Sequence, residues 1–285
     1  MDFVGAGLVI SAAILWGLSG GLGGFLMDKG LDPLVISFFR GAVGFLCILI
    51  WFVFKPTRWD KKMLLWSIVA GLGVAGNFML YFISISEASV AVAATLMYTA
   101  PIFVLFVSFV FRLEKPSLYK WLAIGFVIVG VVLLTEIYNI NFDSITILGL
   151  VTGLGAGSSY ALFLFGFKYA SRYGEPQGIL MMAFLTFTLL MLFFIDRNEA
   201  VSVFYSTDLL WMILLGVIGA GLSFFLYVAG LKRISPTSAS VIAMVEPVTA
   251  SLFGVIVLSE MLTLIQFLGM GIILATVTLL SLKQS

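Results

Sequence analysis

One carboxylate in this sequence stands deep inside an apolar run. Glu246 follows about ten residues of the run 236–258, so a helix would carry it roughly 15 Å towards the middle of a bilayer. An ionised carboxylate at that depth costs about 2.5–3.5 kcal/mol, so it should face protein or water. It could be a counter-charge for an ammonium group or a proton carrier, or it could simply bond to the backbone beside Pro247. We take Glu246 as the leading candidate for substrate binding and proton coupling.

Arg40 is a second charge inside an apolar run, about seven residues into the stretch 33–54. Its guanidinium could bind a substrate carboxylate through two parallel hydrogen bonds. The long side chain could equally reach outward to the interface, or pair with a loop carboxylate or a helix C-terminus. The sequence favours this structural role and leaves substrate binding as the alternative.

Two prolines occupy mid-span positions, Pro101 and Pro247. Each lacks a backbone donor and should free the carbonyl four residues earlier, at Met97 and Ala243. Such breaks are tolerated in a membrane where they are buried or line a cavity. We expect both prolines to act as hinges or to expose carbonyl ligands, although a simple packing kink is the alternative.

Polar and aromatic residues recur at helical spacing and should face inward. The stretch 63–86 carries Gly73, Asn77, Tyr81 and Ser84, and the stretch 208–230 carries Gly219, Ser223, Tyr227 and Gly230. Aromatic rings around a carboxylate suit an amine or amino acid through cation–π contact, but the same residue types also form interface belts and helix packing. The predicted substrate-binding residues are Trp16, Asn77, Tyr81, Tyr98, Tyr160, Tyr227 and Glu246.

Composition places these residues in a membrane protein. Of 285 residues, 62% are hydrophobic and only 10% are charged, far from the balance of a soluble domain. The net charge of +1 gives no field for nucleic acid. With no histidine and a single cysteine, Cys47, we expect no metal site, no cofactor and no enzymatic activity. The expected partners are a small-molecule substrate and the lipid bilayer, with the protein a monomer or homodimer.

Ten apolar runs are long enough to be considered as transmembrane helices. An alternating path with the N-terminus inside leaves only Lys29 and Arg197 on the outer side and Arg40 within a span, so the remaining twelve of the 15 Lys and Arg lie inside. This bias predicts that both termini are cytoplasmic and that the protein is a multi-pass protein of the inner (cytoplasmic) membrane. The runs are 4–27, 33–54, 63–86, 89–111, 118–135, 146–170, 177–195, 208–230, 236–258 and 263–282.

The sequence contains an internal repeat. A shift of 146 residues superimposes Gly73 on Gly219, Tyr81 on Tyr227, Pro101 on Pro247 and Glu114 on Glu260 without a gap. This predicts two related halves, 1–136 and 146–285. Because each half has an odd number of helices, five, the second must be inverted relative to the first, and inverted repeats are a transporter architecture. The expected fold is therefore all-α, with ten transmembrane helices in two inverted five-helix repeats.

Several short segments of the sequence form a recognisable pattern: Trp16-Gly17, Phe38-Phe39-Arg40, Tyr98-Thr99-Ala100-Pro101, Arg112-Leu113-Glu114, Val245-Glu246-Pro247-Val248 and Leu258-Ser259-Glu260. In these segments the chain resembles the drug/metabolite transporter superfamily, in its ten-helix EamA-type branch. The resemblance implies a basket-like bundle whose central cavity is lined by the first, third and fourth helices of each half. It also implies transport, because the superfamily includes exporters of amino acids, amines and other metabolites as well as importers.

Two motif matches point elsewhere and are rejected. Residues 71–76 fit the pattern GxGxxG, but they lie within an apolar run with no preceding strand. Residues 28–32 fit DxxxD, a magnesium-binding spacing in membrane prenyltransferases, but they form a single copy that contains Lys29. We interpret these aspartates as helix caps.

The sequence thus predicts a secondary transporter that exports small metabolites such as amino acids or amines by alternating access, with proton coupling through Glu246. The sequence contains no Walker A motif, so we expect transport that is not driven by ATP hydrolysis. One alternative is a facilitative uniporter or importer on the same fold. A lipid-modifying membrane enzyme is disfavoured, because no paired carboxylates share a face. A purely structural membrane protein would leave Glu246 and the repeat unexplained.

Overall fold

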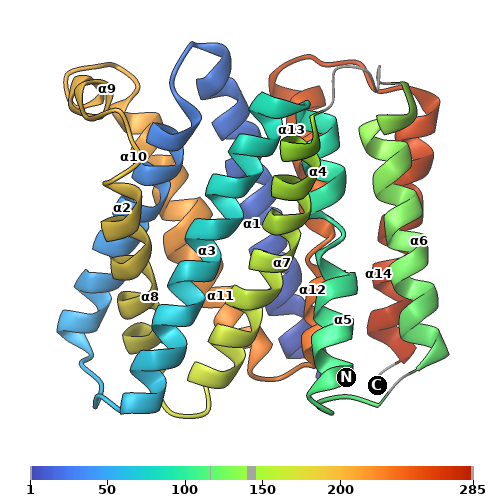
Figure 1. The fold of residues 1–285 in the computed structure, drawn as a ribbon, viewed down its shortest axis with the longest axis horizontal. Helices are drawn as coiled ribbons and strands as arrows, with labels where there is room; N and C mark the ends of the chain where they lie inside the picture. Colours follow the sequence, from blue (N-terminus) through green and yellow to red (C-terminus); the bar gives the residue numbers. More distant parts are fainter. Residues whose placement is uncertain (1, 116, 140–145, 284–285) are drawn as a thin grey trace.

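The computed structural model describes residues 2–115, 117–139 and 146–283, and this part of the chain is helical with no strand. The helices stand side by side in one bundle (Figure 1). The first half contains α1 (Phe3–Asp28), α2 (Pro33–Phe54), α3 (Lys61–Glu87), α4 (Val90–Met97), α5 (Ala100–Val110), α6 (Leu118–Thr135) and the 3₁₀ turn η1 (Ile137–Asn139). The second contains α7 (Ile147–Ala170), α8 (Pro176–Met191), α9 (Arg197–Val203), α10 (Leu209–Gly216), the π-helical η3 (Val217–Leu222), α11 (Ser223–Leu231), α12 (Pro236–Ile242), α13 (Val245–Val257) and α14 (Leu264–Lys283).

Nine helical segments of the described chain are long and apolar enough to cross a membrane. They coincide with nine of the ten predicted runs, counting α4 with α5, α10 to α11, and α12 with α13 as one segment each. The predicted run 177–195 corresponds to α8, an apolar helix of 16 residues that is shorter than a full span. The short helix α9, which Asp196 caps by accepting from the amides of Asn198 and Glu199, was not anticipated.

Aspartates at the loop ends cap the following helices. Asp32 accepts hydrogen bonds from the amides of Leu34 and Val35 at the start of α2, and Asp2 and Asp60 cap α1 and α3 in the same way. Such caps satisfy amides that have no partner within the helix. Asp32 of the DxxxD match therefore caps a helix as expected, whereas Asp28 is the last residue of α1 and caps no helix. The described residues contain no cluster of three His, Cys, Asp or Glu side chains that could hold a metal ion.

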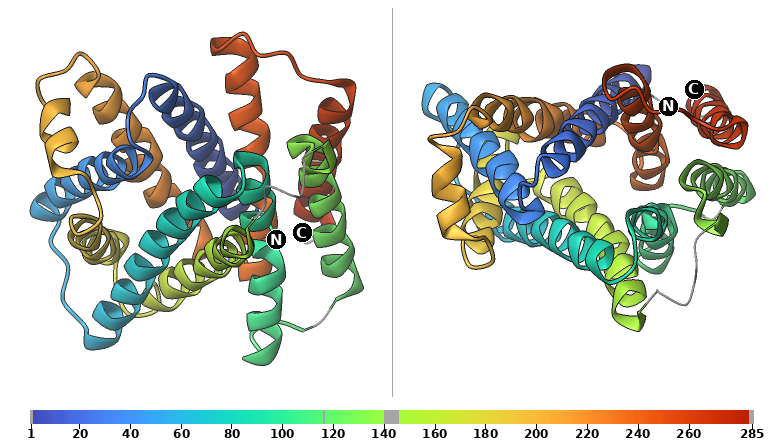
Figure 2. Two further views of the ribbon diagram at one scale, coloured as in Figure 1. Left: turned by 45° about the horizontal axis from the view of Figure 1, so that its top comes forward. Right: turned by 90° about the horizontal axis from the view of Figure 1, so that it is seen from above.

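The two halves interlock through their first and third helices. The most extensive contact between two helices is that of α3 with α7, and the internal repeat relates it to the contact of α11 with α1. Small residues allow the close approach: a Cβ on Gly73 would lie 2.5 Å from the backbone nitrogen of Phe163, and one on Gly166 would lie 2.7 Å from that of Ala70. Helices α6 and α14 pack against each other at the edge of the bundle (Figure 2).

Two of the spans are broken into separate helices. The chain leaves α4 at Tyr98 and re-enters a helix at Ala100, and it leaves α12 at Ala243 and re-enters at Val245. The breaks come just before Pro101 and Pro247, where the sequence predicted them. The expectation that the Ala243 carbonyl is free was wrong, because the amide of Glu246 donates to it over 2.9 Å and closes a tighter turn.

The start of α1 and the end of α14 lie at the same end of the bundle, which we call the terminal end; the opposite end is the distal end (Figure 1). The α5–α6 and α11–α12 connections are at the terminal end, whereas α4 begins and α13 stops at the distal end (Figure 1). Helix α5 packs against α12, whereas α4 and α13 are not among the closely packed pairs of the described helices.

Candidate functional site

The carboxylate of Glu246 lies inside the bundle, in the first turn of α13. Its backbone packs against α1, because a Cβ on Gly17 would lie 2.5 Å from the carbonyl oxygen of Glu246. The side chain is half-buried and forms no hydrogen bond or ion pair with any other described residue. Five side chains, from four helices and the break between α4 and α5, lie within electrostatic range of it: Arg40, Tyr81, Tyr98, Tyr160 and Tyr227.

Arg40 points into the bundle rather than outward to the interface. Its Nε donates to the carbonyl of Gly219 over 3.1 Å, and its guanidinium lies 4.8 Å from the centre of the Phe78 ring. The accepting carbonyl belongs to η3, and π-helical turns are frequent at functional sites. Arg40 and Glu246 influence each other electrostatically but form no ion pair. Arg40 of α2 and Glu246 of α13 thus lie within electrostatic range of each other without a direct contact.

Arg40→Lys is expected to lower the free energy of unfolding by about 1.5–3 kcal/mol, the range for loss of a hydrogen bond to a charged group. Lysine keeps the charge but lacks the planar guanidinium. It cannot donate from an Nε–H to the Gly219 carbonyl and at the same time cover the Phe78 ring with a flat group. The measurement is the melting temperature in detergent, with Arg197→Lys as the control, because Arg197 is exposed in α9. Equal melting of the two variants would show that the bond to Gly219 contributes nothing.

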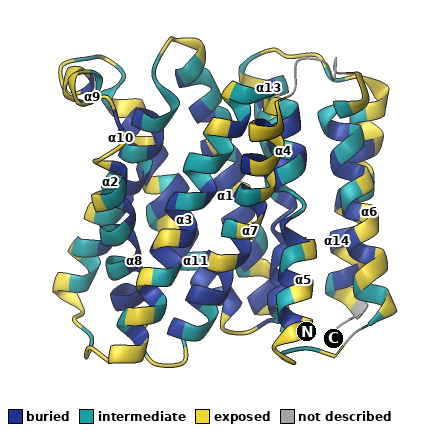
Figure 3. Cartoon of the chain, viewed as in Figure 1, coloured by how far each residue is buried: buried dark blue, intermediate teal, exposed yellow. Residues whose placement is uncertain are grey.

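Aromatic rings form a wall beside Glu246. Trp16 of α1 lies 4.7 Å from the Tyr227 ring, and Tyr160 of α7 lies 4.4 Å from Phe163. All four side chains are buried, as is much of the middle of the bundle (Figure 3). The polar atoms Trp16 Nε1, Tyr160 Oη and Tyr227 Oη have no hydrogen-bond partner in the described chain, although the two hydroxyls approach each other. Unpaired buried donors are costly, so this wall offers hydrogen bonds that the protein itself leaves unused.

The predicted site residues do not all have the same surroundings. Tyr81 and Tyr98 are half-buried and lie within electrostatic range of Glu246. Asn77 instead clamps two helices, because its Nδ2 donates to the Ala156 carbonyl of α7 over 2.9 Å. Two residues that contact the site residues Trp16 and Arg40 were not among the predicted binding residues: Phe163 was not predicted at all, and Gly219 was predicted only to face inward. Phenylalanines are too frequent in apolar helices to stand out, but Gly219 already paired with Gly73 in the repeat.

A hydrogen-bonded carboxylate closes the terminal end. Glu114 Oε1 accepts from the amide of Thr237 over 3.0 Å and from its hydroxyl over 3.1 Å, while Oε2 pairs with Lys120. Ser108 adds a third hydrogen bond to Oε1. Burial alone would raise the pKa of the Glu114 carboxyl, but the bonds from Lys120 and Thr237 outweigh burial and hold that pKa below its usual value of 4.5.

Acid should therefore weaken this contact. Because the pKa of Glu114 is lower in the folded protein than in the unfolded chain, its stabilising effect is complete above that unfolded value and disappears as the pH falls through the folded value. We expect the difference in melting temperature between the wild type and Glu114→Gln to shrink as the pH falls below 4.5. A difference that stays constant over that range would contradict the assignment.

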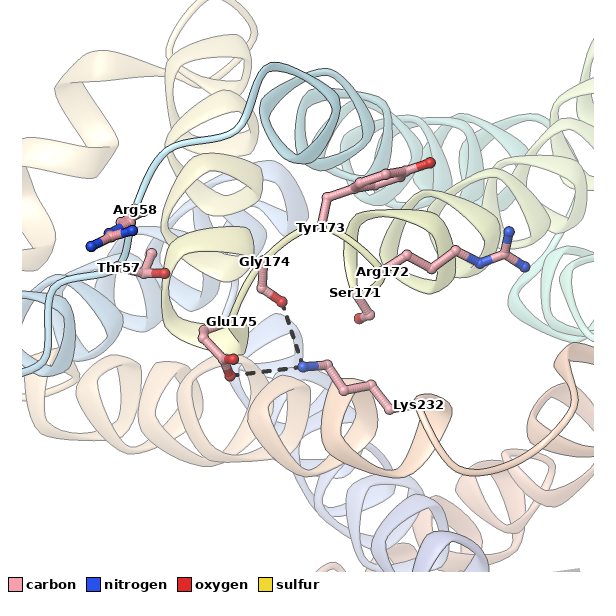
Figure 4. A pocket seen from close by; sticks show the side chains of 8 residues that line it. All are labelled: Thr57, Arg58, Ser171, Arg172, Tyr173, Gly174, Glu175 and Lys232. Carbon is pink, nitrogen blue, oxygen red and sulfur yellow. Dashed lines mark hydrogen bonds and ion pairs between the residues drawn. The ribbon is translucent and has the colours of Figure 1, made fainter.

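A pocket of about 400 Å³ at the terminal end gathers several cations, but they do not converge. Lys232 points to the Gly174 carbonyl and to Glu175, at 3.5 Å and 3.9 Å, while Arg58 and Arg172 point away to opposite sides (Figure 4). The arrangement does not resemble an anion site, and the unpaired charges inside the bundle remain the better candidate.

Comparison with known proteins agrees with this architecture. The sequence model of the EamA-like transporter family matches residues 3–136 and 147–282. One protein of known crystal structure superimposes with a TM-score of 0.77 at 16% sequence identity, covering 99% of this chain and 98% of its own. At this identity the similarity concerns the fold alone.

Similar sequences are described as transporters. An uncharacterized transporter of Archaeoglobus fulgidus is 30% identical over 97% of this chain and 96% of its own length. The uncharacterized inner membrane transporter YicL of Salmonella typhimurium is 25% identical over 97% of this chain and 94% of its own. The threonine/homoserine exporter RhtA of Escherichia coli K12 is 25% identical over 89% of this chain and 84% of its own.

Proposed function

Because this chain belongs to the EamA-like transporter family, within the drug/metabolite transporter superfamily, we propose that it is a secondary active transporter that exports small amino acids or amines. It is a multi-pass protein of the inner membrane. The observation that carries the proposal is the carboxylate of Glu246, unpaired inside the bundle, half-buried and surrounded by tyrosines. A buried charge without a partner is costly unless a ligand or a proton completes it.

The proposed topology has ten crossings, with both termini in the cytoplasm. Helix α8 then serves as the seventh crossing, because it is a predominantly apolar helix of 16 residues and the apolar chain continues beyond it to Ile195. The terminal end of the bundle becomes the cytoplasmic side. The five-helix halves 1–136 and 146–285 are inverted with respect to each other, which supports alternating access between two related states.

In the proposed binding mode the substrate's ammonium group approaches Glu246. Tyr81 and Tyr98 contribute ring faces for cation–π contact, and Trp16, Tyr160 and Tyr227 offer the hydrogen-bond donors that are unused in the free protein. A substrate carboxylate would then lie towards Arg40, whose terminal nitrogens have no partner among the described residues. Pro101 and Pro247 stand next to the breaks and act as hinges. RhtA exports threonine and homoserine by its name, which agrees with an amino acid as the substrate.

The test is competition for transport in proteoliposomes. A labelled amino acid is offered to the wild type, and three unlabelled series compete: intact amino acids, the corresponding amines without the carboxylate, and the corresponding acids without the ammonium. We expect the first two series to compete and the acids to fail. Competition by the acids alone would overturn the role of Glu246 as the counter-charge.

A facilitative uniporter or importer is the alternative within the family, since direction depends on gradients rather than on these side chains. An integral membrane enzyme is not proposed, because the similar proteins are named transporters. Uptake without any gradient dependence would favour the uniporter.

A further inference from the structure

The two ends of the bundle are closed to different degrees. At the terminal end α5 packs directly against α12, whereas at the distal end the described helices α4 and α13 do not pack closely (Figure 2). Under the internal repeat α4 corresponds to α12, and α5 corresponds to α13. The contact between α5 and α12 is thus one of two equivalent contacts, and only one of them is formed.

The start of α4 and the start of α12 have the same local structure. The Ser89 hydroxyl caps α4 by accepting a hydrogen bond of 3.2 Å from the amide of Val92. The Ser235 hydroxyl caps α12 in the same way, with a hydrogen bond of 3.3 Å from the amide of Ser238. A shift of 146 residues relates the two caps, and the same shift places Ala91 on Thr237 in the second position of each helix. Both helix starts therefore present equivalent backbone amides.

The helices that precede the two glutamates also end alike. Helix α5 is followed by Arg112 and helix α13 by Ser259, both with positive φ, at 52° and 58°. In each case an amide beyond this residue bonds back to a carbonyl of the last turn, from Leu113 to Ser108 and from Glu260 to Gly254. This ending is a common helix C-cap. It directs the chain that carries Glu114 or Glu260 away from its helix axis.

The two glutamates differ in what they contact. The side chain of Glu114 is 7% exposed and bonds the start of α12. Glu260 is exposed, and its carboxylate has no hydrogen-bond or ion-pair partner in the described chain. In this state the carboxylate lies beside Gly254 of α13, so close that a Cβ at Gly254 would collide with Glu260 Oε2.

We propose that Glu260 binds the start of α4 when the distal end closes, in place of the bond between Glu114 and the start of α12. The acceptor is a Glu260 carboxylate oxygen and the donor is the amide of Ala91, the repeat equivalent of Thr237. The two contacts alternate, so each stabilises one state of the transport cycle described under the proposed function. Glu114 and Glu260 are positioning residues and do not touch the substrate.

The distal contact has fewer hydrogen bonds than the terminal one. Thr237 donates two hydrogen bonds to Glu114, one from its amide and one from its hydroxyl, but Ala91 has no hydroxyl and could donate only from its amide. Lys120, which pairs with Glu114, corresponds to Gln266, which bonds the Leu134 carbonyl instead. A charged donor strengthens a hydrogen bond to carboxylate. Because the terminal contact has more hydrogen bonds and a charged donor, the protein without substrate is expected to be closed at the terminal end.

The experiment measures distances between spin labels in the detergent-solubilised full chain, with Cys47 replaced by serine. One label pair, at Val90 and Met261, spans the distal end, and another, at Phe111 and Lys232, spans the terminal end. Glu114→Gln is expected to raise the population with a short distal distance on the order of tenfold and to lengthen the terminal distance. Adding Glu260→Gln should reverse the distal change.

Ala91→Thr gives an independent gain of function. The threonine hydroxyl supplies the donor that Ala91 lacks, so the fraction of molecules with a short distal label distance should rise even though Glu114 is intact. Adding Glu260→Gln should cancel this rise. Asp28→Asn, an exposed carboxylate at the same end, is the control and should change neither distance. The proposal is overturned if neither Glu114→Gln nor Ala91→Thr shortens the distal distance. It is also overturned if the distance that either of them shortens stays short when Glu260→Gln is added. These distances need no substrate, so a failed transport assay and a failed distance shift are separate results.

Discussion

Replacing Glu246 by glutamine is expected to reduce substrate transport roughly 30-fold and to abolish accumulation driven by a proton gradient. Glutamine has nearly the same shape but lacks the charge for an ammonium group, a contact of about 2 kcal/mol for hydrogen bonds between charged partners. It also cannot take up and release a proton. The measurement is initial uptake of a labelled amino acid into proteoliposomes.

Glu175→Gln is the matched control, because the Glu175 side chain is 65% exposed at the terminal end. It should transport like the wild type. If Glu246→Gln retains gradient-driven accumulation while melting at the wild-type temperature, then Glu246 belongs to the scaffold. A lower melting temperature alone would not explain a selective loss of accumulation, so both quantities are measured on the same preparations.

Gly17→Val is expected to lower transport more than tenfold and to destabilise the protein. A Cβ at this position would lie 2.5 Å from both the Glu246 carbonyl oxygen and the Thr249 Cβ, and 2.9 Å from the amide nitrogen of Ala250. Two of these atoms are backbone, so relief requires that α1 and α13 separate. Overpacking of this kind costs about 1–3 kcal/mol, and it displaces the turn that positions Glu246.

Gly20→Val in the same helix is the control for helix propensity, because nothing lies within 4 Å of a Cβ at Gly20. Melting in detergent and transport in vesicles are compared for the two variants. Equal stability and activity would mean that α1 and α13 are not held in the close packing described here.

The sequence predicted the spans well because length and hydropathy decide them. It also located both helix breaks, since each proline removes a backbone donor. It did not predict the π-helical turn around Gly219, which depends on contacts with α2 rather than on local composition. For the same reason the hydrogen bond of Asn77 to α7 was not foreseen.

Arg40 illustrates a further limit. Its depth in the span predicted a cost for the charge but not the direction of the side chain, and the favoured structural partners were a loop carboxylate, a helix C-terminus or the interface. The structure provides the Gly219 carbonyl and the Phe78 ring instead. Both come from elements far from α2 in sequence, so a single sequence offers no signal for them. The terminal nitrogens of Arg40 have no partner among the described residues and lie within electrostatic range of Glu246.

The central claim, that Glu246 couples substrate to protons in a secondary transporter, is tested most directly by one uptake experiment. Wild-type proteoliposomes with an acidic interior and controls without a gradient are given the same labelled amino acid, alongside Glu246→Gln vesicles. We expect accumulation above the external concentration only in wild-type vesicles with the gradient, because protons leaving the vesicle are exchanged for entering substrate. Equal uptake with and without the gradient, unchanged by Glu246→Gln, would contradict it.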